Sequence, residues 1–398
     1  MKRISTSSHG RWSVLQPTAV NRVLDEVRAL QSRGQSLVSL MRGQPDLPTP
    51  PAVIEAAEHA MRSGRTGYPD NRGEPALRRA VAERLRRDHG LDYDPEREML
   101  ITDGATGGLF AALGALLEPG AEVLLPEPIY DAYTGPIQVW GGKPVFVPPL
   151  FENGRFSVDV QALKNAVSKR TRAILINTPW NPVGTVFRAD ELRAIDEFAA
   201  EHDLRLLSDE IYETLTFDGK KHVSPASLSA TARARTILIN SFSKTYAMPG
   251  WRVGYCAAAA EIIDRMLLLW QQFSRGPATF IQDAAVAALE LGRDYHDNVA
   301  REYQTRRDLL LAGLRGIDGV IPLVPEGGFF VMLDVRGLGM SSDQVRRRLL
   351  DAGVVVLHGS AYGQAGEGLL RVSFAAGGDV LLKGMEQLRA GLACVSRS

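Results

Sequence analysis

Two cationic residues, Lys244 and Arg252, follow a short apolar run at residues 236–239. A run of this length, rich in isoleucine, is typical of a buried strand. A lysine just past the end of such a strand is partly desolvated, which lowers its pKa and frees the amine for Schiff-base formation. A lysine in a polar loop is more often simply solvated, so the chemistry depends on what else the chain brings beside Lys244.

Polar residues follow each of three apolar runs in the middle of the chain. They are Asn177, Asp209 and Ser241, and each interval between them fits one strand–helix–strand crossover. Parallel strands open their carboxyl ends on one edge of a sheet, where ligands bind in α/β folds. We therefore expect the three polar residues to face one crevice, together with Lys244. The three runs are 173–176, 204–208 and 236–239.

A glycine-rich turn, Gly104–Gly108, lies between an expected strand at 99–102 and an expected helix at 109–117. Backbone N–H groups and the positive end of a helix dipole favour a phosphate at such a turn, although many turns hold glycine only for tightness. The turn lacks the lysine of a Walker A loop, and it does not match the dinucleotide G-x-G-x-x-G pattern. A small phosphorylated cofactor therefore fits better than a dinucleotide.

Three further residues suit a pyridine cofactor in this crevice. A buried carboxylate at Asp209 can keep a pyridine nitrogen protonated, although an isolated aspartate is more often a helix cap or a solvated group. Tyr130 offers an aromatic face for stacking, unless it is a core or turn residue. Arg252 can bind a phosphate through two nitrogens.

These motifs together resemble the class I/II aminotransferases, which are fold-type I pyridoxal 5'-phosphate (PLP) enzymes. The resemblance runs end to end and is nearest in style to aspartate, aromatic and kynurenine aminotransferases. It implies a mostly parallel central sheet sandwiched by helices, plus a smaller α+β domain. The segments that carry it are GQPD (43–46), GY (67–68), the turn at Gly104, NTPWNPVGT (177–185), SDEIY (208–212), SFSKTYAMPGWRVG (241–254) and LRVSF (370–374).

The resemblance implies a role for each matching residue. Lys244 would form the Schiff base with the cofactor and then shuttle the proton. Asp209 would pair with the pyridine nitrogen, Tyr212 and Asn181 would bind the ring hydroxyl, and Tyr130 would stack on the ring. The phosphate would be held by Gly104, Ala105, Thr106, Ser241, Ser243 and Arg252.

The resemblance also implies how substrate binds. Arg371 would clamp the α-carboxylate, with Asn181 and the backbone of Gly43 assisting, since arginine suits a planar carboxylate. The small domain and the N-terminal segment would close over the substrate. Tyr68 would reach the cofactor phosphate of a neighbouring subunit, so a homodimer with shared active sites is expected.

Four residues bear on specificity. Arg42 and Arg275 stand where relatives often carry smaller residues, and either could bind an acidic side chain or form a surface ion pair. Trp12 and Tyr362 are candidates for lining the pocket. The sequence does not identify the substrate's side chain.

Composition excludes several classes of function. The chain has 398 residues, a formal net charge of +0 and 23% charged residues, which gives no sign of a nucleic-acid or membrane partner. The N-terminus lacks the apolar core of a signal peptide, and no apolar segment is long enough to span a bilayer. Cys256 and Cys394 have no partner at metal or redox spacing, so a cytoplasmic protein without a metal site is expected.

The expected architecture has three parts. Residues 1–48 form an N-terminal arm and part of the small domain, 49–300 the large PLP-binding domain, and 301–398 the small C-terminal domain. A helix over 74–89 is rich in arginine, and we expect its arginines on the solvent face.

Three functions compete. The first is ping-pong transamination between an L-amino acid and a 2-oxo acid. The second is another PLP reaction in the same crevice, by a lyase, cyclase or oxidase. The third is the ligand-sensing half of a transcription regulator, which would need a fused helix-turn-helix segment. We see no room for one before the first expected helix, at residues 17–33.

Overall fold

A seven-stranded sheet forms the centre of the computed structural model, which describes residues 15–396. All of its strands run in one direction except β10, which is antiparallel to both neighbours. In spatial order the strands are β2 (Met99–Thr102), β10 (Gly254–Ala257), β9 (Thr236–Ser241), β8 (Arg205–Asp209), β7 (Thr171–Asn177), β3 (Glu122–Pro126) and β4 (Lys143–Val147).

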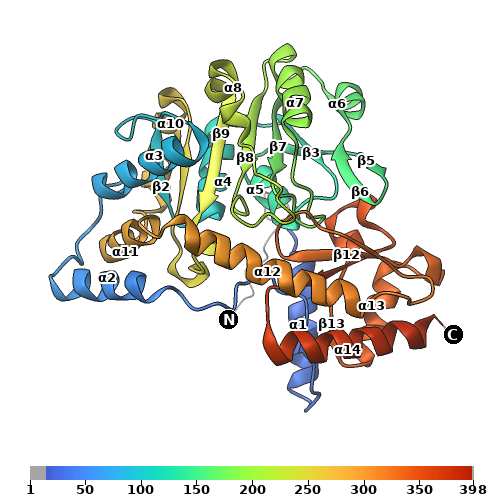
Figure 1. The fold of residues 1–398 in the computed structure, drawn as a ribbon. Coiled ribbons are helices and arrows are strands. Elements are labelled where there is room, and N and C mark those ends of the chain that lie inside the picture. The colour runs from blue at the N-terminus through green and yellow to red at the C-terminus, as the bar shows by residue number, and fades with distance from the viewer. Residues whose placement is uncertain (1–14, 397–398) are drawn as a thin grey trace, which may run out of the picture.

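Helices cover both faces of this sheet (Figure 1). Alternate strand residues enter separate cores, because successive side chains of a strand point to opposite faces. Leu100 and Ile239 pack with α4 and α10, whereas Ile101 and Leu238 pack with α2, α3 and α11. The helices around the sheet are α2 (Pro51–Arg62), α3 (Pro75–His89), α4 (Ala105–Leu116), α5 (Thr134–Val139), α6 (Val160–Ala166), α7 (Ala189–Glu201), α8 (Ala230–Arg235), α9 (Phe242–Thr245), α10 (Ala260–Phe273) and α11 (Thr279–Leu289).

A second, four-stranded antiparallel sheet lies in the C-terminal part of the chain. The long helix α12 (Arg293–Gly313) runs from the large sheet toward it, as Figure 1 shows in orange. The strands of this second sheet are, in spatial order, β11 (Ile321–Leu323), β12 (Phe330–Asp334), β15 (Leu369–Ser373) and β14 (Leu357–His358). Helices α13 (Ser342–Asp351) and α14 (Gly378–Val395) pack against them.

The N-terminal segment joins this C-terminal unit. Strand β1 (Val38–Ser39) pairs in parallel with β13 (Val354–Val355), and α1 (Ala19–Gln31) packs on the same region through Val23 and Val27. The predicted division at residues 48 and 300 remains a prediction. The fold class is the expected one, an α/β protein with a mostly parallel central sheet.

The structure corrects several sequence predictions. Helix α4 begins at Ala105, inside the segment expected to be a turn, because Gly104 (φ +79°) makes the break in a single residue. Strand β10 and the hairpin of β5 (Pro149–Glu152) and β6 (Arg155–Val158) were not predicted. Arg78 and Arg84 of α3 are only 3% exposed, so the expectation that its arginines face solvent is wrong for both. No helix among residues 15–396 is long and apolar enough to cross a membrane.

Candidate active site

The predicted strand ends do meet at one edge of the sheet. Strands β7, β8 and β9 are parallel neighbours that end at Asn177, Asp209 and Ser241. The side chain of Asn177 ties two of these ends together: its Nδ2 donates to the Asp209 carbonyl oxygen at 2.8 Å, and its Oδ1 accepts from the Asn181 N–H at 2.7 Å. This edge is the candidate active site.

Lys244 lies in the four-residue helix α9, which begins directly after β9. Its Nζ donates to the Gly43 carbonyl oxygen at 2.5 Å, which brings the N-terminal segment to the lysine. Burial and, to a smaller extent, the positive charges of Arg371 and Arg252 lower the pKa of Lys244 to about 8, against the opposing effect of Asp209. Roughly a tenth of the amine is therefore unprotonated at pH 7, far more than for an ordinary lysine, and the unprotonated form is the nucleophile.

Asp209 is 6% exposed at the end of β8. Its Oδ2 accepts a hydrogen bond from the Tyr133 hydroxyl at 2.6 Å, and its Oδ1 lies 3.4 Å from the Ile211 N–H. Burial raises the pKa of Asp209 to about 6, because hydrogen bonds to Tyr133 and Ile211 offset only part of the desolvation. Such a carboxylate gains stability from a cationic hydrogen-bond donor.

Tyr133 was missed by the sequence analysis, although it is the side chain that contacts Asp209. It lies one turn after Tyr130 in the 3-10 helix Asp131–Tyr133, and the two rings pack edge-to-face with centroids 5.4 Å apart. The Tyr-x-x-Tyr spacing at residues 130–133 was the available signal. Tyr212, 3% exposed, packs its ring edge-on against Phe329, and burial raises the pKa of its hydroxyl.

The glycine turn and Arg252 form a cradle. Gly104 is the N-cap of α4, so Ala105 and Thr106 lie in the first turn, where backbone N–H groups have no partner within the helix. The Arg252 Nη2 donates to the Asp103 carbonyl oxygen at 3.0 Å. A Cβ on Gly104 would lie 2.7 Å from that Nη2, so a larger residue would displace the guanidinium. Arg252 itself has a φ of +54°, which is uncommon for a residue other than glycine.

Two serines from the lysine segment lie next to one another. The Ser241 Oγ donates to the Ser243 Oγ at 2.8 Å and accepts from the Ser243 N–H at 3.1 Å. Both serines are buried. The hydroxyls predicted to hold phosphate are thus already arranged as a pair.

Arg371, on β15, is a buried cation held by neutral partners. Its Nη1 donates to the Asn181 Oδ1 at 3.3 Å and its Nη2 to the Met41 carbonyl oxygen at 2.9 Å. The guanidinium carbon lies 3.9 Å from the Phe330 ring centroid and 4.9 Å from that of Tyr362. The Nε is buried without a hydrogen-bond partner, and among residues 15–396 no carboxylate forms an ion pair with Arg371. An anionic ligand would complete its coordination.

The remaining predicted residues that the structure describes lie on the protein surface. Tyr68 is 91% exposed and projects from the surface. Arg42 and Arg275 are also exposed; Arg275 lies 3.4 Å from the Asn71 Oδ1, and within the described chain neither arginine forms an ion pair. Trp12 lies outside the described residues.

The profile of the family "Aminotransferase class I and II" matches residues 35–383. The chain belongs to this family. An aromatic-amino-acid aminotransferase of Thermococcus litoralis is 37% identical to it over 95% of this chain and 96% of that protein. An arginine–pyruvate transaminase of Pseudomonas aeruginosa is 39% identical over 88% of each. The aspartate aminotransferase structure from Rhizobium meliloti superposes with a TM-score of 0.92 at 32% identity, covering 97% of this chain and 98% of that one.

The family resemblance drawn from the motifs is therefore confirmed, and this aminotransferase has the fold expected for it. The protein is a transaminase. The relatives' names cover aromatic, aspartate and arginine substrates, so they do not select one amino acid. The roles of the individual site residues remain predictions.

Proposed function

We propose that this aminotransferase binds PLP at the carboxyl edge of its large sheet and moves an amino group from an L-amino acid to a 2-oxo acid by a ping-pong mechanism. The observation that carries the proposal is that two groups occur together at this edge of the sheet. Lys244 has a lowered pKa, and Asp209 is a buried carboxylate without a cationic partner within ion-pair distance in the described chain. When bound, PLP supplies an aldehyde for the amine and a protonated ring that accepts electrons.

The residues present fit this cofactor. Asp209 would hold a proton on the ring nitrogen, since its buried carboxylate lacks a positive partner. Tyr130 would cover one ring face, and Tyr212 would donate to the ring hydroxyl. The cradle of Gly104 and Arg252 would hold the phosphate, because the backbone N–H groups at the start of α4 and the guanidinium both favour an anion.

Arg371 and Lys244 would divide the work on the substrate. Arg371 and Asn181 would orient the α-carboxylate and thereby fix the direction of the α C–H bond, and positioning of this kind can be worth several kcal/mol. Lys244 would accept that proton at its Nζ and then donate it to a different carbon of the reacting molecule, which completes the proton shuttle. Its contact with Gly43 would be replaced on substrate binding, which links the N-terminal segment to the reaction.

A homodimer and a cytoplasmic location are part of this proposal. Tyr68 is 91% exposed, and α2 nearby exposes Ile54 and Met61, at 42% and 44%. These side chains support a subunit contact through which Tyr68 would reach the partner's phosphate. Both cysteines are free, Cys256 buried and Cys394 exposed, which suits a reducing compartment.

A panel of acidic, aromatic and basic amino acids tests the function. Each is mixed with the PLP-loaded protein while the visible spectrum is followed. Transamination predicts conversion of the cofactor to its amine form and recovery on adding a 2-oxo acid, with loss of both in Lys244→Ala. Release of ammonia or of a side-chain fragment, without the amine form, would instead identify a lyase and contradict the proposal.

A further inference from the structure

A second buried carboxylate, Glu213, lies on the same segment as Asp209 and Tyr212 and is 5% exposed. Its Oε1 accepts hydrogen bonds from the Arg84 Nη2 at 2.5 Å and from the Asn240 Nδ2 at 2.7 Å. Its Oε2 lies 2.7 Å from the His89 Nε2. Glu213 thus joins α3 to Asn240, near the carboxyl end of strand β9.

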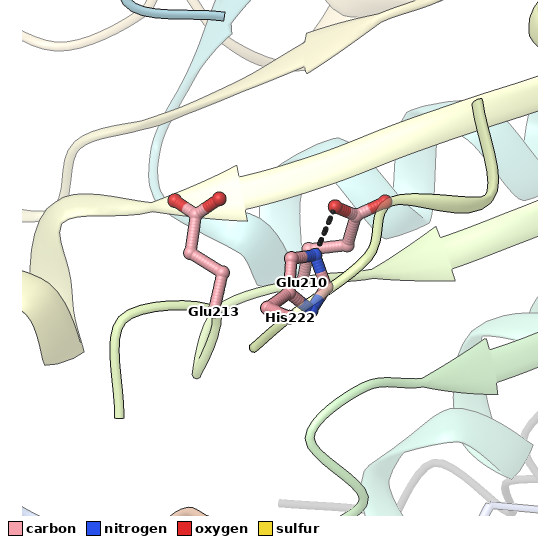
Figure 2. Close-up of side chains that lie close together, drawn as sticks. All are labelled: Glu210, Glu213 and His222. Carbon is pink, nitrogen blue, oxygen red and sulfur yellow. Dashed lines mark hydrogen bonds and ion pairs between the residues drawn. The ribbon is translucent and has the colours of Figure 1, made fainter. Parts of the chain in front are cut away.

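Figure 2 shows Glu213 beside Glu210 and His222, whose ligand atoms lie within 4.8 Å of one another. That spacing would suit a metal ion, but these atoms already have partners. The Glu210 Oε1 accepts from Ser208 and Ser224, its Oε2 faces the His222 Nε2 at 2.8 Å, and the charge of Arg84 lies against Glu213. The cluster is therefore better described as an internal hydrogen-bond network than as a metal centre.

This network fastens the two segments that carry the predicted catalytic residues. Glu213 directly follows Tyr212, and Asn240 directly precedes Ser241, whose N–H it binds through Oδ1 at 2.7 Å. Further along the two segments, the hydroxyls of Thr214, which follows Glu213, and Thr245, which follows Lys244, lie 3.0 Å apart. The Glu210 N–H also donates to the Ile239 carbonyl oxygen at 2.9 Å.

We propose that Glu213 is a positioning residue for transamination, which holds the Tyr212 segment against the Lys244 segment through Asn240. The inference rests on the proposed function. It assigns the carboxylate a role distinct from that of Asp209, because the partners of the Glu213 side chain are Arg84, His89 and Asn240, none of which is predicted to hold the cofactor. Its partners Arg84 and Asn240 are themselves buried, at 3% and 1% exposure, so packing restricts the side chains on both sides of the connection.

Physical chemistry explains why a carboxylate is used here. A carboxylate accepts several hydrogen bonds at once, so Glu213 can bind two elements, α3 and β9, to its own segment from one point. Arg84 and His89 supply the charge that its burial requires. A catalytic group displaced by ~1 Å can lose about 10²-fold in rate, so fixing this separation matters for function.

The test compares four variants with the wild type. Glu213→Ala removes the connection, and Glu213→Gln keeps an acceptor of the same shape. Asn240→Ala cuts the link to β9, together with the Asn240 hydrogen bond to the Ser241 N–H, while Arg84 and His89 still neutralise Glu213. The matched control is Glu122→Ala. Glu122 is 6% exposed at the opposite end of the sheet and is bound by Ser168 and Arg170.

The readouts are the dissociation constant for PLP, the pH midpoint of the visible absorbance of the loaded protein, kcat and KM separately, and the thermal midpoint. We expect Glu213→Ala and Asn240→Ala to weaken PLP binding about tenfold and to lower kcat about 10- to 100-fold, with KM nearly unchanged. The absorbance midpoint should move by about 0.5 pH unit or more. Glu213→Gln should restore most of each loss.

Glu122→Ala should lower only the thermal midpoint. If Asn240→Ala and Glu213→Ala behave like Glu122→Ala, Glu213 has a structural role alone and the inference is wrong. Should Glu213→Ala not fold, Asn240→Ala decides the question. Failure of the wild type to take up PLP would overturn the proposed function instead, which separates the two outcomes.

Discussion

Asp209 and Glu213 lie on one short segment and are buried to nearly the same degree, at 6% and 5% exposure. Their surroundings are opposite. Asp209 has a tyrosine hydroxyl for a partner, and burial raises its pKa to about 6. Burial would also raise the pKa of Glu213, but the charge of Arg84 and the hydrogen bond from His89 hold it well below the usual range.

This contrast distinguishes a carboxylate with a structural role, Glu213, from one that is suited to bind a cationic ligand, Asp209. A carboxylate whose counter-charge comes from the chain is complete in the folded protein, and removing its partner leaves a buried charge. A carboxylate without one makes the folded protein less stable until a cation arrives. Arg371 is the cationic equivalent of Asp209, because its partners are a neutral amide and a carbonyl group.

The largest expected difference between the two carboxylates is in catalysis. Asp209→Asn should lower the single-turnover rate about 10³-fold, because the ring nitrogen would lose the group that keeps it charged. Glu213→Gln, which keeps an acceptor in place, should lower the rate less than about tenfold. Rapid mixing of the loaded variants with an active amino acid measures both. Equal losses in the two variants would remove the distinction.

Arg371 extends the comparison to the substrate side. Arg371→Lys should raise KM about 10²-fold with a smaller fall in kcat, since an ammonium group cannot form the two parallel hydrogen bonds of a guanidinium. Steady-state kinetics with the best amino acid of the panel would measure this change. Arg307→Lys, at an ion pair between a buried arginine and the exposed Asp218, is the control and should leave KM unchanged. A fall in kcat alone would argue against carboxylate binding by Arg371.

The stability of the cofactor-free protein should depend on pH through Asp209. Its pKa is about 6 in the folded protein against 3.8 in the unfolded chain, so the folded state binds more protons between these values. Stability therefore falls as pH rises through that window, by about 3 kcal/mol for this group. Lys244 does not contribute there, because both states keep its proton below pH 7.

Urea unfolding at pH 4.5 and pH 7 in wild type and Asp209→Asn isolates this contribution. At pH 7, Asp209→Asn should be more stable than the wild type by about 1–3 kcal/mol, whereas Glu213→Gln should be less stable. A destabilised Asp209→Asn protein at pH 7 would show that Asp209 already has a sufficient partner.

The smallest expected effect belongs to Tyr133. Tyr133→Phe removes one hydrogen bond to Asp209, which should raise the carboxyl pKa further and slow transamination about tenfold or less. The pH dependence of the visible spectrum and the single-turnover rate would report both changes. Tyr93→Phe is a matched control, since the Tyr93 hydroxyl is buried without a hydrogen-bond partner. If the two variants behave alike, Tyr133 does not tune Asp209.

Local sequence patterns were sufficient for the strands that carry the site. The expected strand at 99–102 coincides with β2, and the apolar runs at 173–176, 204–208 and 236–239 fall on β7, β8 and β9, whose polar end residues do meet at one edge. A strand of this kind is specified by its own residues, so its end can be located from the sequence.

Side-chain partners far apart in the chain could not be predicted. Arg84 lies in an arginine-rich helix whose pattern favours solvent exposure, and its contact with Glu213 depends on how α3 packs on the sheet. Tyr133 contacts Asp209 only because a 3-10 turn after β3 redirects the chain. Such contacts follow from tertiary packing, which periodicity does not encode.

The most direct test of the central claim is to reduce the PLP-loaded protein with borohydride and locate the attached cofactor by peptide mass spectrometry. The account predicts one phosphopyridoxyl group, on the peptide that contains Lys244, and none in Lys244→Ala. Attachment at another lysine, or uptake of PLP without any reducible bond, would contradict it.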